Sequence, residues 1–211
     1  MIRSLVWKDF LLVRFRVLIS IGVIALVLSM MDSRPRSAAM FGAIAVHMVT
    51  SVLFIQAGSV EEKSRGDLLL LLLPLSRRQI VAGRYAFLLA AATSLAVVYL
   101  AMLGVGGGMS MAPVDWLKTA GQCVTLTMAI WSLGLPLVVA YGVTRTQGLL
   151  SLGMMLLPGL WLALIRNIAR SYGYDGVLLQ AVASPWMLAA VLVLACASCL
   201  VSVRLYERRD F

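Results

Sequence analysis

Long apolar stretches, separated by short polar breaks rich in glycine and proline, dominate the chain. Because a helix needs about 20 apolar residues to cross a bilayer, each stretch is a candidate transmembrane helix. Prolines 35 and 113 lie in the breaks, where we assign them to turns. The pattern predicts one all-α integral membrane domain over residues 1–211. It has six spans, at about 17–31, 37–60, 85–105, 117–143, 147–166 and 185–206.

Residues 1–16 mix apolar and basic positions ahead of the first span. Ile2, Leu5 and Val6 begin a helical spacing of apolar side chains, although Asp9 intrudes on their face. Trp7 and the nearby basic residues suit an interfacial helix lying at the membrane surface. A slanted extension of the first span fits the same periodicity equally well.

Prolines interrupt two of the later apolar stretches. Gly134-Leu135-Pro136 lies inside the fourth span and Pro158-Gly159 inside the fifth. Because proline removes a backbone hydrogen bond, we expect the helix to bend or break at both places. Residues 167–183 are too polar at their start to form a span, and their second half is expected to dip partway into the bilayer.

Composition and charge support a membrane class and suggest an orientation. Hydrophobic residues make up 62% of the chain and charged residues only 13%, whereas soluble domains carry roughly a quarter. With a cytoplasmic N-terminus, thirteen of the 18 Lys and Arg residues face inward. The five that face outward are Arg34, Arg36, Lys118, Arg166 and Arg170. Both termini and residues 61–84 are therefore predicted to be cytoplasmic.

The net charge of +9 does not point to nucleic acid, because the basic residues flank spans and form no run interleaved with aromatics. No metalloprotease or serine-hydrolase motif is present, and no Gly-Lys pair exists that could form a nucleotide-binding P-loop. Cys123, Cys196 and Cys199 lie in apolar stretches and are interpreted as packing residues. We therefore expect no catalytic residue, cofactor or metal on this chain.

Three of the polar side chains within predicted spans are singled out as candidates, namely His47, Gln56 and Gln122. Intramembrane polar residues are candidates for lining a translocation path. The alternative is an interhelical hydrogen-bonding role. The acidic residues, in contrast, all fall in predicted loops or interfaces, which argues against transport coupled to protons or sodium.

The stretch at 61–85, EEKSRGDLLLLLLPLSRRQIVAGRY, stands apart from the spans on either side of it. Gly66 interrupts the helix leaving the second span, and Asp67 is a reasonable N-cap for a short leucine helix. Pro74 ends that helix. Ser76 and Gln79 then match a capping box that starts the next helix. The short helix is predicted either to lie on the membrane or to dock into a groove of a cytoplasmic partner.

Taken together, this stretch, Lys8-Asp9 near the N-terminus, six spans and the ending YERRDF resemble the small permease subunits of ABC type-2 transporters. The resemblance is chiefly to the compact bacterial permeases of the bacitracin- and peptide-export kind. It covers the whole chain in layout, but only about 25 residues are motif-like.

The resemblance implies a permease that lacks its own ATPase, pairs with a second copy or a paralogue, and sits in membrane lipid of the bacterial cytoplasmic membrane. A separate subunit would bind ATP and magnesium and drive export of a peptide, drug or lipid-like cargo. Residues 1–16 would be the interfacial helix and residues 167–183 the outer re-entrant region. The residues that couple to the ATPase would be Gly66, Asp67, Leu68, Leu69, Leu70, Leu71, Leu72, Leu73, Pro74, Ser76 and Arg77.

One departure from the family concerns the coupling helix itself. Members often carry an acidic residue inside it, whereas here Asp67 is followed only by leucine up to Pro74. The docking contact is therefore expected to be more apolar than is usual.

Two other functions fit the sequence. A lipid-modifying membrane enzyme would use Arg166, Arg170, Tyr172 and Asp175 at the outer face. A scaffold or immunity protein would bind a partner without transporting anything.

Overall fold

The computed structural model describes residues 6–9, 11, 19, 22, 35–64, 76–105, 113–153, 156, 159–160 and 185–208. This part of the chain is all-helical, as expected from the sequence. Its long helices are α2 (Pro35–Lys63), α4 (Arg77–Val105), α5 (Pro113–Tyr141) and α8 (Pro185–Glu207). All four are long and apolar enough to cross a membrane. Of two further predicted spans, 17–31 lies outside the described residues except for residues 19 and 22, and so does half of 147–166.

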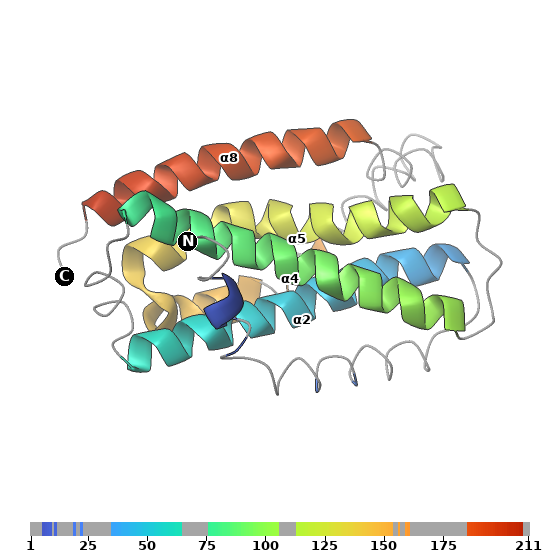
Figure 1. Ribbon diagram of the computed structural model, residues 1–211, viewed down its shortest axis with the longest axis horizontal. Coiled ribbons are helices and arrows are strands. Elements are labelled where there is room, and N and C mark those ends of the chain that lie inside the picture. Colours follow the sequence, from blue (N-terminus) through green and yellow to red (C-terminus); the bar gives the residue numbers. More distant parts are fainter. Residues whose placement is uncertain are drawn as a thin grey trace.

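The four helices lie side by side as a bundle (Figure 1). Helix α5 packs against the other three, and α4 also contacts α2 and α8. The C-terminal ends of α2, α5 and α8 lie together with the N-terminal end of α4, at the left of Figure 1. We call this the charged end, because Glu61, Arg77, Arg84 and Arg204 lie there or one to two turns from it.

Proline occupies the first position of α2, α5 and α8. At this position the missing N–H does no harm, because the first N–H groups of a helix have no partner within it. The sequence analysis assigned Pro35 and Pro113 to turns and began these helices at 37 and 117. The assignment of both prolines to turns was wrong, because they begin the helices instead of preceding them.

The predicted capping box at the start of α4 is confirmed. The Ser76 N–H donates to Gln79 Oε1 at 3.0 Å, and the Gln79 N–H donates to Ser76 Oγ at 3.3 Å. This reciprocal pair satisfies two N–H groups that the helix cannot satisfy itself.

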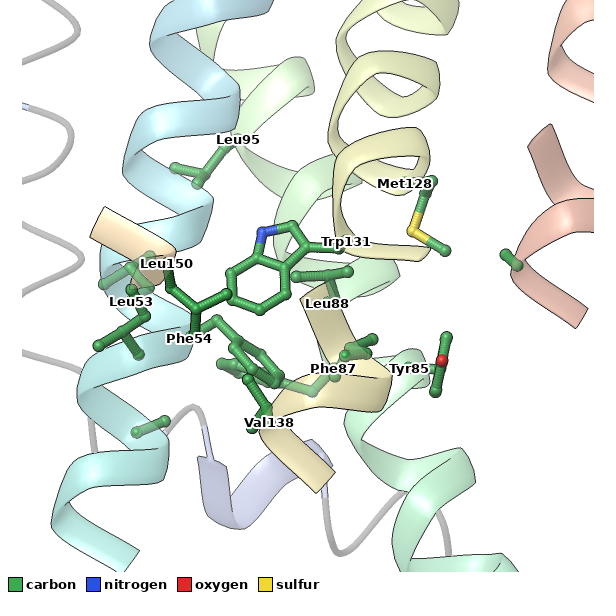
Figure 2. Close-up of a cluster of buried hydrophobic side chains, with 14 of the residues drawn as sticks. Leu53, Phe54, Tyr85, Phe87, Leu88, Leu95, Met128, Trp131, Val138 and Leu150 are labelled. Atoms are coloured by element: carbon green, nitrogen blue, oxygen red, sulfur yellow. The ribbon is translucent and has the colours of Figure 1, made fainter. Parts of the chain in front are cut away.

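An aromatic cluster fills the centre of the bundle (Figure 2). Trp131 on α5 is fully buried, and its ring centroid lies 4.4 Å from that of Phe54 on α2. Phe87 on α4 adds a third ring, 6.3 Å from Phe54. The indole N–H of Trp131 donates to Ser51 Oγ at 2.9 Å, so the polar atom of this large side chain is satisfied inside the core.

Helices α2 and α4 pack against each other at Gly42 and Tyr99. A Cβ atom built there would lie 2.2 Å from the ring of Tyr99, closer than any real contact. Small residues at such crossings let two membrane helices approach and pack. Gly42 is therefore needed for the contact between α2 and the buried Tyr99 ring.

Of the bend or break predicted at Gly134-Leu135-Pro136, the break does not occur. Helix α5 continues through Pro136 to Tyr141. Pro136 has no N–H, so the carbonyl of Ser132, four residues earlier, loses its helical donor. The hydroxyl of Ser198 on α8 donates to this carbonyl instead. A neighbouring helix thus satisfies the freed group, which lets the proline remain inside an apolar helix.

Helix α5 ends five residues after Pro136, at Tyr141, and Gly142 follows it. This glycine has a φ of 88°, in the left-handed region that glycine adopts without strain. Its N–H donates to the Val138 carbonyl at 2.8 Å and completes α5. Its own carbonyl accepts the Thr146 hydroxyl at 2.6 Å, and a second helix runs from 143 to 153. A single residue therefore joins the two helices.

We expect Gly42→Ala to destabilise the bundle by about 1–3 kcal/mol, because the added methyl overpacks the contact with Tyr99. Thermal unfolding in detergent measures the effect. Gly121→Ala on α5 is the control, since a Cβ there meets no atom within 4 Å. An equal melting temperature for Gly42→Ala and the wild type would contradict the assigned role of Gly42.

Candidate functional site

The predicted coupling residues Gly66 to Pro74 lie outside the described residues, whereas Ser76 and Arg77 are described. What the structure places is the chain on either side of that stretch. One flank is the last turn of α2, up to Ser64, and the other is the first turns of α4, from Ser76. Both flanks lie at the charged end.

Glu61, in the last turn of α2, is the centre of an ionic cluster. Its Oε1 lies 2.7 Å from Lys8 Nζ, and its Oε2 lies 3.6 Å from Arg84 Nη2 on α4. Lys8 Nζ is also 3.3 Å from Asp9 Oδ1. Residues 6–9 are helical, so the cluster ties this N-terminal turn to both flanks of the coupling stretch.

The cluster changes the ionisation of the N-terminal pair. Burial lowers the pKa of the Lys8 ammonium, but attraction and a hydrogen bond from Glu61 outweigh burial, so the pKa lies above the ordinary 10.5. Burial raises the pKa of the Asp9 carboxyl above the ordinary 3.8, against the opposing charge of Lys8. Lys8 is therefore held in its charged form, while ionisation of Asp9 is disfavoured.

The next residue on α2, Glu62, contacts a different element. Its Oε2 accepts the Thr144 N–H at 2.8 Å. Thr144 lies in the first turn of the 143–153 helix, where N–H groups have no partner within the helix. A carboxylate at a helix N-terminus also interacts favourably with the helix dipole. Glu62 therefore caps this helix from α2.

The other flank contacts α8 through Arg77. Its Nη1 donates to the carbonyls of Tyr206 and Glu207, at 3.3 Å and 2.7 Å. These carbonyls belong to the last turn of α8, which has no helical donor for them, and a cation is favourable there. Arg78 also pairs with Glu207 at 3.5 Å, but both side chains are exposed and the pair contributes little.

We define the charged collar as the side chains of Lys8, Glu61, Glu62, Arg77 and Arg84. Through them, the two flanks of the coupling stretch contact the N-terminal turn, the 143–153 helix and α8. A displacement of either flank would therefore act on several segments at once. Of the collar, the sequence analysis named only Arg77 as a site residue. The signal for Glu61 and Glu62 was available, since a pair of acids ends an otherwise apolar span.

The intramembrane candidates are dispersed. His47 on α2 is fully buried, and neither ring nitrogen has a hydrogen-bond partner among the described residues. Gln56 follows it by nine residues, which places it about 180° around the helix. Gln122 is half-buried on α5. Because His47 and Gln56 face different sides of α2, a shared site for them would need contributions from other elements. Their role in a translocation path stays a prediction.

Other candidate chemistry receives no support from the described part. Within it, no three His, Cys, Asp or Glu side chains are grouped to hold a metal ion. The three cysteines are free, with Cys123 buried and Cys196 exposed. The enzyme alternative rested on Arg166, Arg170, Tyr172 and Asp175. Those four residues and the region 167–183 lie outside the described residues.

A family model described as ABC-2 family transporter protein matches residues 4–207. The chain belongs to this family. It is thus a membrane-spanning permease subunit of an ABC transporter, and the family implies an ATP-binding partner subunit. No curated protein and no solved structure matches the chain.

We expect Glu61→Gln to destabilise the permease by about 1–3 kcal/mol, because Lys8 and Arg84 lose their charged partner while partly buried. Thermal unfolding in detergent is the measurement, and Lys63→Gln is the control. Lys63 is an exposed charge in the same turn of α2, where a substitution changes stability by about 0.5 kcal/mol or less. Equal effects of the two substitutions would show that the ionic cluster adds no stability.

Asp9→Asn should reveal the raised pKa of Asp9 as a pH dependence. In the unfolded chain Asp9 ionises near its ordinary pKa of 3.8, while the folded protein retains the proton to higher pH. The wild type therefore loses stability relative to Asp9→Asn as the pH rises from about 3.8 through the raised pKa. Unfolding curves of both proteins between about pH 3.5 and 7.5 measure this difference. A relative gain by the wild type over this range would show that pairing with Lys8 outweighs burial.

Proposed function

We propose that this permease exports a peptide, drug or lipid-like cargo, driven by ATP hydrolysis on a separate subunit. The charged end faces the cytoplasm of a bacterium, and both termini lie there. The ATP-binding subunit docks on the short apolar helix at Gly66–Leu73 and moves it. The permease pairs with a second copy or a paralogue, so that two docking helices meet two ATP-binding subunits.

One observation carries the coupling role. The charged collar connects the chain immediately before and after the docking helix to the N-terminal turn, the 143–153 helix and α8. A loop serving only as a connector has no need of such contacts, and exposed ion pairs alone would add little stability. Glu61 is buried in this cluster. Arg77 donates to carbonyls in the last turn of α8 that have no donor within that helix. A movement of the docking helix would therefore be transmitted through its two flanks to these segments.

The pairing of two permeases and the lipid contacts receive support from exposed apolar side chains. Val97 on α4, Leu133 on α5 and Val193 on α8 are all more than half exposed within the single chain. In a membrane, such side chains are covered by lipid or by another protein.

Leu70→Asp should abolish docking, because a carboxylate would have to enter an apolar contact without a partner. We expect at least a tenfold loss of complex with the ATP-binding subunit encoded beside the chain, measured by co-purification. ATPase activity stimulated by the permease should fall with it. Leu70→Met is the matched control, since it keeps the volume and apolar character of leucine.

Unchanged complex formation and ATPase activity in Leu70→Asp would refute the coupling role of this helix. A scaffold is distinguished by a further measurement on the purified complex in vesicles. A transporter moves its cargo only when ATP is present, whereas a scaffold binds the partner and moves nothing.

A further inference from the structure

The end of α5, residues 137–141, lies between two joints in the backbone. At the first joint, Pro136 supplies no N–H to the Ser132 carbonyl, so the helix there lacks one of its own hydrogen bonds. At the second, Gly142 adopts a φ of 88° and the chain turns into the 143–153 helix. Helices bend most readily where the backbone ladder is interrupted in this way.

The first joint is closed by a chain of hydroxyl groups. Ser198 Oγ donates to the Ser132 carbonyl and has no second proton to give. The Tyr85 hydroxyl, 2.7 Å from Ser198 Oγ, must therefore be the donor in that contact. Its oxygen is then left to accept from Ser202 Oγ at 3.0 Å. All the hydrogen bonds run in one direction, which strengthens each of them.

Each joint is thus held by a residue close to the coupling stretch. Tyr85 lies in the first turns of α4, nine residues after Ser76, and acts on the Pro136 joint through Ser198. Glu62 lies in the last turn of α2 and holds Thr144, directly after the Gly142 joint. One joint is therefore linked to the chain leaving the coupling stretch, and the other to the chain entering it.

We propose that Tyr85 and Glu62 are positioning residues that transmit motion of the coupling stretch to residues 137–141 of α5. The inference rests on the proposed ATP-driven function. When the two flanks move, the hydroxyl chain and the carboxylate contact shift, and the end of α5 bends at Pro136 and pivots at Gly142. Leu137 and Tyr141 are exposed on this segment, so its outer face moves against lipid or a second permease.

Hydrogen–deuterium exchange tests the proposal on the full permease with its ATP-binding subunit, in phosphatidylethanolamine–phosphatidylglycerol nanodiscs. In the wild type, amide exchange over 137–142 should differ between the nucleotide-free and the vanadate-trapped states. Tyr85→Phe removes one hydroxyl of the chain. It should raise exchange over 137–142 about fivefold without nucleotide, the effect of one hydrogen bond, and abolish the nucleotide dependence.

Two further variants make the test specific. Pro136→Ala restores an N–H to α5 and should lower exchange over 137–142 in both states. Thr93→Val removes a hydroxyl from the same helix as Tyr85, but among the described residues this hydroxyl donates to the carbonyl of Leu89 within α4. It should behave as the wild type. Unchanged exchange over 86–99 in Tyr85→Phe shows that the bundle remains folded.

The outcomes separate the inference from the function on which it rests. If the wild-type permease forms no complex with the ATP-binding subunit, the proposed function fails. If the complex forms but exchange over 137–142 is the same in both nucleotide states, the inference alone fails. A state-dependent exchange that Tyr85→Phe leaves intact would refute the positioning role of Tyr85.

Discussion

A polar group inside an apolar bundle is costly unless the protein supplies a partner, and the contacts between the helices of this structure depend on that constraint. The Ser132 carbonyl shows it most clearly, because Pro136 removes its helical donor and α8 supplies a serine hydroxyl in exchange. Trp131 obeys the same rule through Ser51. These polar contacts fix which faces of α2, α5 and α8 meet, since lipid offers no substitute partner. Apolar packing alone would leave more freedom of rotation.

At the charged end the same constraint applies to full charges. Glu61 and Arg84 are largely buried, and the cluster they form with Lys8 and Asp9 contains two acids and two bases. Removing one partner from such a cluster leaves another charge buried without compensation, which lowers the stability of the folded protein. The arrangement therefore favours one relative position of the N-terminal turn, α2 and α4. The chain between the last two, where we propose the docking helix, therefore begins and ends at defined positions.

Local features were predicted well from the sequence, and features that join distant segments were not. The capping box at Ser76 and Gln79 spans three residues, so its signal was complete in one short stretch. The start of α8 at Pro185 was also predicted, and composition correctly indicated apolar spanning helices. The predicted break at Pro136 does not occur, because the Ser198 hydroxyl replaces the missing donor to the Ser132 carbonyl. These two residues are 66 positions apart, so no local pattern in the sequence shows the contact. Lys8 and Glu61 are 53 residues apart, and no periodicity pairs them.

The contacts of Arg77 set an order of events during synthesis. Arg77 is synthesised early, yet the carbonyls to which it donates belong to Tyr206 and Glu207, which follow it by 129 and 130 positions. Until α8 has entered the membrane, the first turn of α4 lacks this contact. The chain that follows the proposed docking helix is therefore incomplete at this end while the permease is still on the ribosome. We expect the ATP-binding subunit to engage that helix only after α8 has been inserted.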